Sequence, residues 1–165
     1  MIVTRLLVLT LSMLFASVAH SEEPFVPSID ILEYGMFEAT VVKEQVSEGT
    51  SLGAIDVLKE VKLVKQTTDI PGKLGNRFGI RIILKETYAK GKVMFLAKVL
   101  HPKTVNPKTK EETTLDQWKV YVRGGQKRYV GWTFDYPWEI VPGKWTIQLW
   151  HNGDKITEKT FNIHL

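Results

Sequence analysis

Residues 144–163 read KWTIQLWHNGDKITEKTFNI, and this stretch carries the clearest structural signal in the chain. Its first half alternates apolar with polar side chains, a period of two that is typical of a strand with one buried face. The apolar members are Trp145, Ile147 and Leu149. Asn152 and Gly153 follow, and both residue types tolerate the positive φ angles of a type I′ turn. The stretch therefore predicts a β-hairpin that joins 144–150 to 155–163.

The same alternation recurs in the preceding sequence, interrupted by glycine and proline. Further strands are predicted over 29–42, 57–67, 80–85, 92–100, 118–122 and 130–134. The segment 54–65 also fits a helix, with Leu58 and Val61 on one side, but its β-branched residues favour a strand. Seven or eight short strands without an alternating series of helices indicate an all-β fold, an antiparallel immunoglobulin-like β-sandwich.

Glycine and proline also predict how these strands are connected. Residues 88–91 are few enough to join 80–85 and 92–100 as a hairpin. Residues 69–72 end in Pro71 and Gly72 and are predicted to form a turn. The segment 101–110 contains two prolines and is expected to be the longest loop.

The N-terminus has the order of a cleavable secretory signal. Arg5 is followed by an apolar run from 6 to 19, which is shorter than the roughly 20 residues of a membrane-spanning helix. Small residues allow cleavage after Ala19 or after Ser21, and we favour the second. The predicted organisation is a signal peptide over 1–21, an extended leader over 22–28 and a single β-sandwich domain over 29–165.

The residue inventory argues against several kinds of chemistry. The chain has no cysteine, which excludes thiol catalysis, disulfides and a lipid-modified N-terminal cysteine. Outside the predicted signal, the histidines are His101, His151 and His164, and their spacing places no two on one face. Asp135 and Glu139 are the nearest approach to a paired-carboxylate site, but their spacing alone does not establish its geometry. We therefore predict a protein that is not an enzyme and has no cofactor or metal.

Aromatic residues are concentrated in the C-terminal part of the chain, which holds all five tryptophans. Strand parity assigns three of them to the core, because they share a face with aliphatic neighbours. These are Trp118, Trp132 and Trp145. Four other rings are predicted to contact a ligand or partner, either on outward strand positions or in the loop around Pro137. These are Tyr129, Tyr136, Trp138 and Trp150. An alternative role for Trp138 is to close the open end of the sandwich.

The C-terminal motifs resemble those of a bacterial family described as domain of unknown function 3859. The residues that carry the resemblance are Gly131, Trp132, Thr133, Phe134, Pro137, Trp138, Glu139, Pro142, Gly143, Lys144, Trp145, Thr146 and Ile147, with Tyr34 and Gly35 near the N-terminus. The resemblance implies bacterial export and a small domain. It implies no activity, substrate or catalytic residue.

These observations favour a non-catalytic binding or adaptor module that is periplasmic or secreted by a bacterium. Two alternatives stay open: a carbohydrate-binding module that uses the exposed aromatic rings, and an inhibitor or chaperone-like partner that uses a sheet edge. The expected partner is a protein or glycan of the cell envelope. The formal net charge of +4 is weak evidence for an anionic partner, and nucleic acid is not expected outside the cytoplasm. The mature chain is predicted to have no membrane span.

Overall fold

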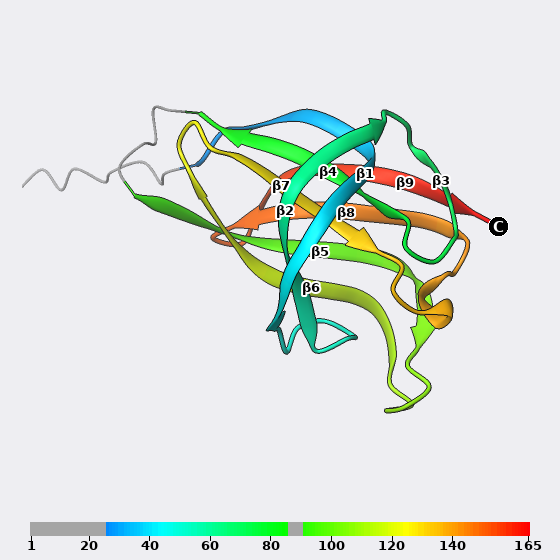
Figure 1. Cartoon of the computed structure of the whole chain (residues 1–165). Coiled ribbons are helices and arrows are strands. Elements are labelled where there is room, and N and C mark those ends of the chain that lie inside the picture. The colour runs from blue at the N-terminus through cyan, green and yellow to red at the C-terminus, as the bar shows by residue number, and fades with distance from the viewer. Residues whose placement is uncertain (1–25, 86–90) are drawn as a thin grey trace, which may run out of the picture.

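Two β-sheets face one another in the structure, a computed structural model that describes residues 26–85 and 91–165 (Figure 1). One sheet has the strand order β2-β1-β4-β7 and the other has the order β3-β9-β8-β5-β6. The strands are β1 (Ile29–Val46), β2 (Ala54–Lys65), β3 (Asp69–Pro71), β4 (Arg77–Leu84), β5 (Lys92–Val105), β6 (Glu112–Arg123), β7 (Lys127–Thr133), β8 (Gly143–His151) and β9 (Asp154–His164). A short 3-10 helix, η2 (Pro137–Glu139), lies between β7 and β8. The all-β prediction is confirmed, and the described residues form nine strands in place of the seven or eight expected.

Some of the sequence predictions fall on parts of the chain that the structure does not describe. The signal peptide predicted over 1–21, residues 22–25 of the predicted leader and residues 88–90 of the predicted connection lie outside the described residues. Within the described part, no helix is long and apolar enough to cross a membrane.

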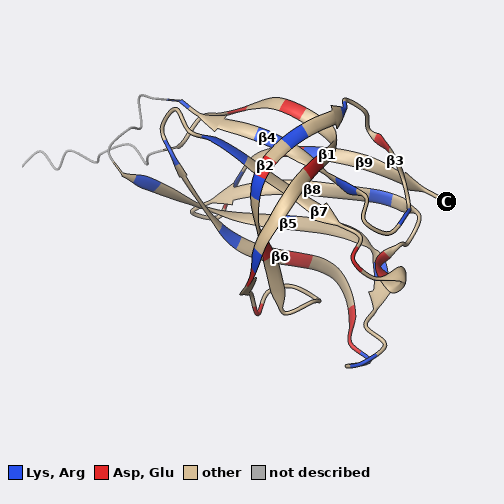
Figure 2. Ribbon diagram, in the orientation of Figure 1, with Lys and Arg blue, Asp and Glu red and all other residues tan. Residues whose placement is uncertain are grey.

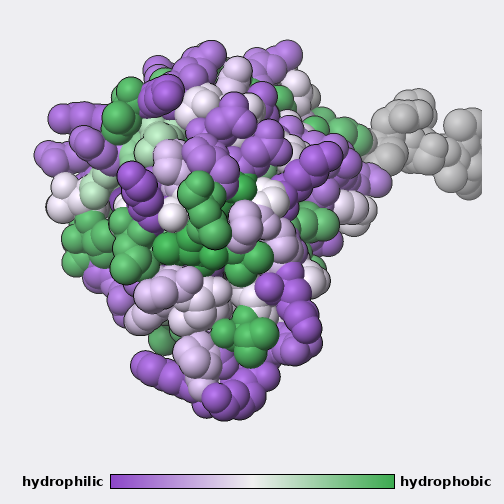
Figure 3. All heavy atoms as spheres, turned by 90° about the vertical axis from the view of Figure 1, so that its right-hand side faces the viewer, coloured by the Kyte–Doolittle hydropathy of each residue, from purple (hydrophilic) through white to green (hydrophobic). Residues whose placement is uncertain are grey.

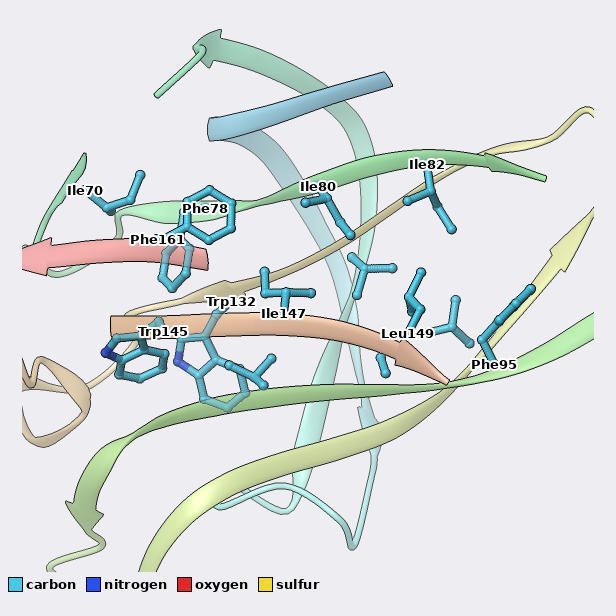
Figure 4. Close-up of a cluster of buried hydrophobic side chains, with 14 of the residues drawn as sticks. Ile70, Phe78, Ile80, Ile82, Phe95, Trp132, Trp145, Ile147, Leu149 and Phe161 are labelled. Carbon is cyan, nitrogen blue, oxygen red and sulfur yellow. The ribbon is translucent and has the colours of Figure 1, made fainter. Parts of the chain in front are cut away.

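Apolar side chains at alternate strand positions fill the space between the sheets (Figure 4). The fully buried residues of the central strands β4 and β8 are Phe78, Ile80, Ile82, Leu84, Trp145, Ile147 and Leu149. Trp132 is also in this core with 7% of its surface exposed. Trp118 is only half-buried and packs at the edge of the core, where its ring centroid lies 6.4 Å from that of Trp132. Parity therefore placed Trp132 and Trp145 correctly, whereas Trp118 lies where the sandwich opens.

The C-terminal hairpin forms as predicted. β8 and β9 pair antiparallel from Gly143 opposite Ile163 to His151 opposite Asp154. Asn152 and Gly153 at the turn have φ angles of 49° and 94°. Both values are in the region that a type I′ turn requires, so local turn chemistry sets the register of this pair.

Two of the predicted connections are wrong. Residues 69–71, expected to form a turn, make the strand β3, which pairs parallel with β9 and fully buries Ile70. β4 does not pair with β5, because β4 lies between β1 and β7 while β5 belongs to the opposite sheet. Both errors concern pairing between segments far apart in sequence, which local turn residues do not encode. The five-stranded sheet is consequently mixed, whereas the pairs of the four-stranded sheet are all antiparallel.

The loop predicted over 101–110 is also shorter than expected. β5 continues through Pro102 to Val105, with an irregular register between Leu100 and Thr104. Proline lacks a backbone N–H and is tolerated in a strand at such irregular positions. A buried contact of His101, described below, holds this part of the strand in place.

β1 changes its partner along its length of 18 residues. Residues 29–37 pair with β4, whereas residues 36–46 pair with β2. Three register shifts in the β1–β2 pair bend the strand, because each bulge adds local twist. Residues 38–59, which we call the arm, thereby extend beyond β4 as a hairpin of β1 and β2 and cross the open side of the sandwich towards β6 (Figure 1).

The tip of the arm is fastened to the opposite sheet. The backbone N–H of Gln117 in β6 donates to the carbonyl of Gly49 at 2.7 Å, and the backbone N–H of Ser51 donates to the carboxylate of Asp116. The arm therefore connects the four-stranded sheet to the edge of the five-stranded sheet.

Candidate ligand-binding site

A cavity of about 740 Å³ lies between the arm and the neighbouring edges of the two sheets. Val41, Ile55 and Leu58 line it from the arm, and Trp118 lines it from β6. Every residue of β7, from Lys127 to Thr133, also lines it. Because successive side chains of a strand point to opposite faces, this lining shows that the cavity meets β7 along its edge.

β7 is the last strand of its sheet. It pairs with β4 on one side, and within the described residues no strand pairs with it on the other. Alternate residues of an antiparallel strand direct their backbone N–H and C=O groups away from the paired neighbour. The cavity is therefore bordered by backbone groups that can form hydrogen bonds with an added strand.

Tyr129 forms the floor of the cavity on the outer face of β7. Its hydroxyl donates to the carbonyl of Phe78 at 2.8 Å, and its ring lies over Gly79 and Gly131, where a side chain would collide with it. The ring of Phe37 contacts it edge-on with centroids 4.9 Å apart. Burial raises the pKa of Tyr129, so the phenol stays neutral. Parity predicted the outward direction of Tyr129, but Phe37 of β1 packs against the ring.

Substitution of Gly131 by alanine is expected to destabilise the protein by about 1–3 kcal/mol. A Cβ at this position would lie 2.0 Å from the Tyr129 hydroxyl oxygen and 2.3 Å from the Phe78 carbonyl oxygen, so both must move. Chemical denaturation of Gly131→Ala measures the effect. The control is Lys127→Ala at an exposed position of the same strand, which should change stability by less than about 0.5 kcal/mol. Equal stability of the two variants would contradict this packing.

Charged residues divide the cavity into an ion-paired part and a basic end. Arg77 is 7% exposed and contacts Asp56 of the arm at 3.0 Å, and its Nε donates to Thr133 at 2.7 Å. Arg81 pairs with Glu33 at 2.7 Å. The basic end carries Lys127 and Arg128 at the start of β7, and Lys119 lines the cavity from β6; none of the three forms an ion pair with a described residue. Figure 2 shows Lys and Arg along β6 and β7.

The opposite end of the cavity is acidic. Asp135 lies there beside Tyr136, and Glu44 lines the wall formed by the arm. Burial raises the pKa of Asp135, and the negative charges of Asp56 and Glu44 act in the same direction, while the Arg77 guanidinium opposes them. The charges along the cavity therefore run from basic at the start of β7 to acidic beyond its end.

Trp132 contributes an unsatisfied donor to the lining. Its Nε1 is buried and has no hydrogen-bond partner among the described residues. A buried indole N–H usually has a partner, because leaving it unsatisfied costs about 1–3 kcal/mol. An acceptor on a bound ligand would satisfy it.

A second polar group is buried next to Trp145 and is closed to solvent. His101 Nε2 lies 2.8 Å from Asp116 Oδ2, and each side chain is 1% exposed. His101 Nδ1 lies 2.8 Å from the carbonyl of Pro102, and the ring stacks on Trp145 with centroids 4.7 Å apart. No substrate reaches this pair, so it serves the structure: it joins β5 and β6 to the tip of the arm through Asp116.

The four predicted contact residues do not form one site. Tyr129 and Tyr136 line the cavity, and Trp138 stacks on Tyr136 with centroids 6.1 Å apart and an interplanar angle of 17°. Trp150 lies apart, on the outer face of the five-stranded sheet, where Lys98 Nζ is 4.1 Å from its ring and Gln148 accepts its N–H. Of the three residues in η2, the buried one is Glu139 rather than Trp138.

Sequence reasoning missed the arm and the indole N–H of Trp132. The alternation in 29–42 and 57–67 indicated two strands but not their bending across the sandwich. Parity placed Trp132 in the core without showing that its ring also reaches the cavity.

Apolar side chains gather on the end of the molecule that carries the β3–β4 connection and the C-terminus (Figure 3). Leu74 and Leu165 in these segments are 56% and 84% exposed. The described residues contain no group of three or more His, Cys, Asp or Glu side chains that could hold a metal ion.

Two facing sheets with this pairing define an immunoglobulin-like β-sandwich protein. An immunoglobulin-like protein from Pseudomonas aeruginosa, PA1606, has a similar fold, with a TM-score of 0.57 and 24% sequence identity over 83% of this chain and 97% of that chain. The alkylpurine DNA glycosylase AlkC of Pseudomonas fluorescens, solved with DNA containing an abasic site analog, matches 59% of this chain and 28% of its own at 13% identity and a TM-score of 0.36. No curated protein matches the chain significantly.

Residues 25–163 match the model of the family described as Domain of unknown function (DUF3859). The chain belongs to this family, as the C-terminal motifs indicated.

Proposed function

We propose that this protein is a non-catalytic binding module of the bacterial cell envelope, which takes its ligand in the cavity between the arm, β6 and β7. The observation that carries the proposal is a cavity of about 740 Å³ that runs beside an unpaired strand edge. Its volume is within the roughly 300–1,000 Å³ of ligand sites. The signal-like N-terminus supports a periplasmic or secreted location.

The chemistry of the lining supports binding rather than catalysis. The described residues around the cavity include no histidine and no serine. Arg77 is held by Asp56 and Thr133 in an arrangement that fastens the arm to the sheet. The buried His101–Asp116 pair is sealed from solvent, so it offers no base to a substrate.

Carbohydrate binding is a second candidate, favoured by the Tyr136–Trp138 pair. Tyr136 is 46% exposed, and its ring lies nearly parallel to that of Trp138. An exposed ring face of this kind can stack on a sugar, in a contact worth about 1 kcal/mol. Because the two rings cover one another, the pair presents few free faces, so we rank this function second.

Tryptophan fluorescence tests the proposal, because Trp118 and Trp132 line the cavity. Titration with pooled random twelve-residue peptides and with soluble peptidoglycan fragments should shift the emission for one class of ligand. Ala54→Phe fills the cavity from the arm and should weaken a cavity ligand at least tenfold. Thr160→Phe, at an exposed position of β9, is the matched control and should leave binding unchanged.

The outcomes separate the two candidates. A shift that survives Ala54→Phe and disappears in Trp138→Ala would favour the carbohydrate site instead. Absence of any shift at millimolar concentrations of both ligand classes would contradict the binding function.

A further inference from the structure

We propose that the ligand of this cavity is an extended, acidic polypeptide segment that adds as a strand to the free edge of β7. This inference rests on the binding function proposed above and names the class of ligand.

The shape of the cavity favours an extended chain. It follows β7 over all seven residues from Lys127 to Thr133, a length of about 20 Å for a strand. A compact ligand contacts only part of such a site, whereas an extended segment reaches its whole length. The edge also supplies regularly spaced backbone donors and acceptors, which in strand addition give affinity for any sequence.

The walls on either side of the edge suit the alternating side chains of an added strand. Apolar residues of the arm, including Val41 and Ile55, lie on one side, and Trp118 and Trp132 lie on the other. Successive side chains of the segment would meet these two walls in turn. An acceptor of the segment would also satisfy Nε1 of Trp132, which has no partner among the described residues.

The charges that line the cavity indicate that the bound segment is acidic. The guanidinium groups of Arg77 and Arg81 are already paired with Asp56 and Glu33. The remaining cations that line the cavity are Lys119, Lys127 and Arg128, which have no ion pair with a described residue. Carboxylates of the segment would therefore lie at the start of β7, away from Asp135 and Glu44 at the other end.

Two pools of random twelve-residue peptides with equal apolar content test the inference, one carrying Asp and Glu and the other Lys and Arg. The acidic pool should bind at least tenfold more tightly by tryptophan fluorescence. Amide hydrogen exchange, measured by NMR, should slow at least tenfold at alternate residues of 127–133.

Charge reversal provides a matched pair of variants. Lys127→Glu with Arg128→Glu should weaken binding of the acidic pool at least tenfold. Lys62→Glu with Lys65→Glu makes the same change in net charge at exposed positions of β2 that do not line the cavity, and should leave binding unchanged.

Each contrary outcome identifies what fails. A fluorescence shift without slower exchange in β7 would overturn strand addition while the cavity remains a binding site. Equal binding of the two pools, or equal effects of the two charge reversals, would overturn the acidic character of the segment. Absence of binding by either pool, together with a shift on adding peptidoglycan fragments, would overturn the polypeptide ligand and leave a binding module for glycans.

Discussion

Asp116→Ala is expected to lower the free energy of unfolding by about 3–5 kcal/mol, the range observed when one member of a buried ion pair is removed. Asp116 Oδ2 lies 2.8 Å from His101 Nε2, and the other ring nitrogen faces the carbonyl of Pro102 at 2.8 Å. Asp116 is thus the buried partner of one ring nitrogen of His101, and its other oxygen accepts the backbone N–H of Ser51. Removing Asp116 would leave His101 Nε2 and the backbone N–H of Ser51 without their partner in the interior.

The same substitution should also release the arm. Asp116 accepts the backbone N–H of Ser51, and its neighbour Gln117 binds Gly49. Urea denaturation measures the loss of stability, and hydrogen exchange should become faster at residues 47–53. Glu112→Ala breaks the exposed Lys103–Glu112 pair and should cost less than about 1 kcal/mol, which makes it the control. A loss of less than about 1 kcal/mol in Asp116→Ala would refute the role assigned to the pair.

The free energy of unfolding of the wild-type protein is expected to fall as the pH rises from about 4.5 to about 7, because of Glu139. Glu139 is 1% exposed, and burial raises its pKa from 4.5 to about 7. Hydrogen bonds from the backbone N–H groups of Tyr136 and Asp135 oppose this rise, whereas the charges of Asp135 and Asp116 add to it. Its Oε1 has no partner among the described residues, which suits a neutral carboxyl group better than a carboxylate.

The sign of the effect follows from which state holds the proton. In this window the folded protein keeps a proton that the unfolded chain has already released, so the free energy of unfolding falls as the pH rises. The difference between a pKa of 4.5 and one of about 7 corresponds to about 3 kcal/mol. The contribution is complete below about pH 4.5 and is lost above about pH 7. Asp135, whose pKa is also raised, contributes with the same sign.

Denaturation at pH 4 and pH 8 tests this expectation. The stability difference between the two pH values should shrink by about 3 kcal/mol in Glu139→Gln, because the amide does not titrate but can still accept the two backbone N–H groups. Asp154→Asn, at the exposed first position of β9, is the control and should keep the wild-type difference. An unchanged pH dependence in Glu139→Gln would show that Glu139 does not carry it.

The candidate site was predicted only in part. Tyr136 was named from its place beside Pro137, and it lines the cavity. Tyr129 was assigned to the correct face, but its contact with Phe37 depends on a residue about 90 positions earlier in the sequence. Trp150 points outward as predicted, but it lies on the five-stranded sheet, away from the cavity. Strand parity predicts which face a side chain is on, and it does not predict which sheet the strand joins.

The buried polar groups were the least predictable feature. The sequence placed His101 and Glu139 in loops, with Asp135 as the possible partner of Glu139 and no partner for His101. Their burial arises from the packing of β5, β6 and η2 around Trp145, which brings Asp116 to His101 across 15 positions. A polar residue is buried where tertiary contacts satisfy it, and those contacts leave no periodic pattern in the sequence.

The sequence by itself determined the strand content, the alternation that separates core from surface and the register of the β8–β9 hairpin. These features follow from periods of two residues and from the φ angles that Asn152 and Gly153 tolerate, and both are local properties. Tertiary structure alone decided that β3 pairs with β9, that β4 and β5 lie in different sheets and that the arm crosses to β6. Such choices depend on which distant faces bury one another best, and the resulting arrangement placed the unpaired edge of β7 beside a cavity.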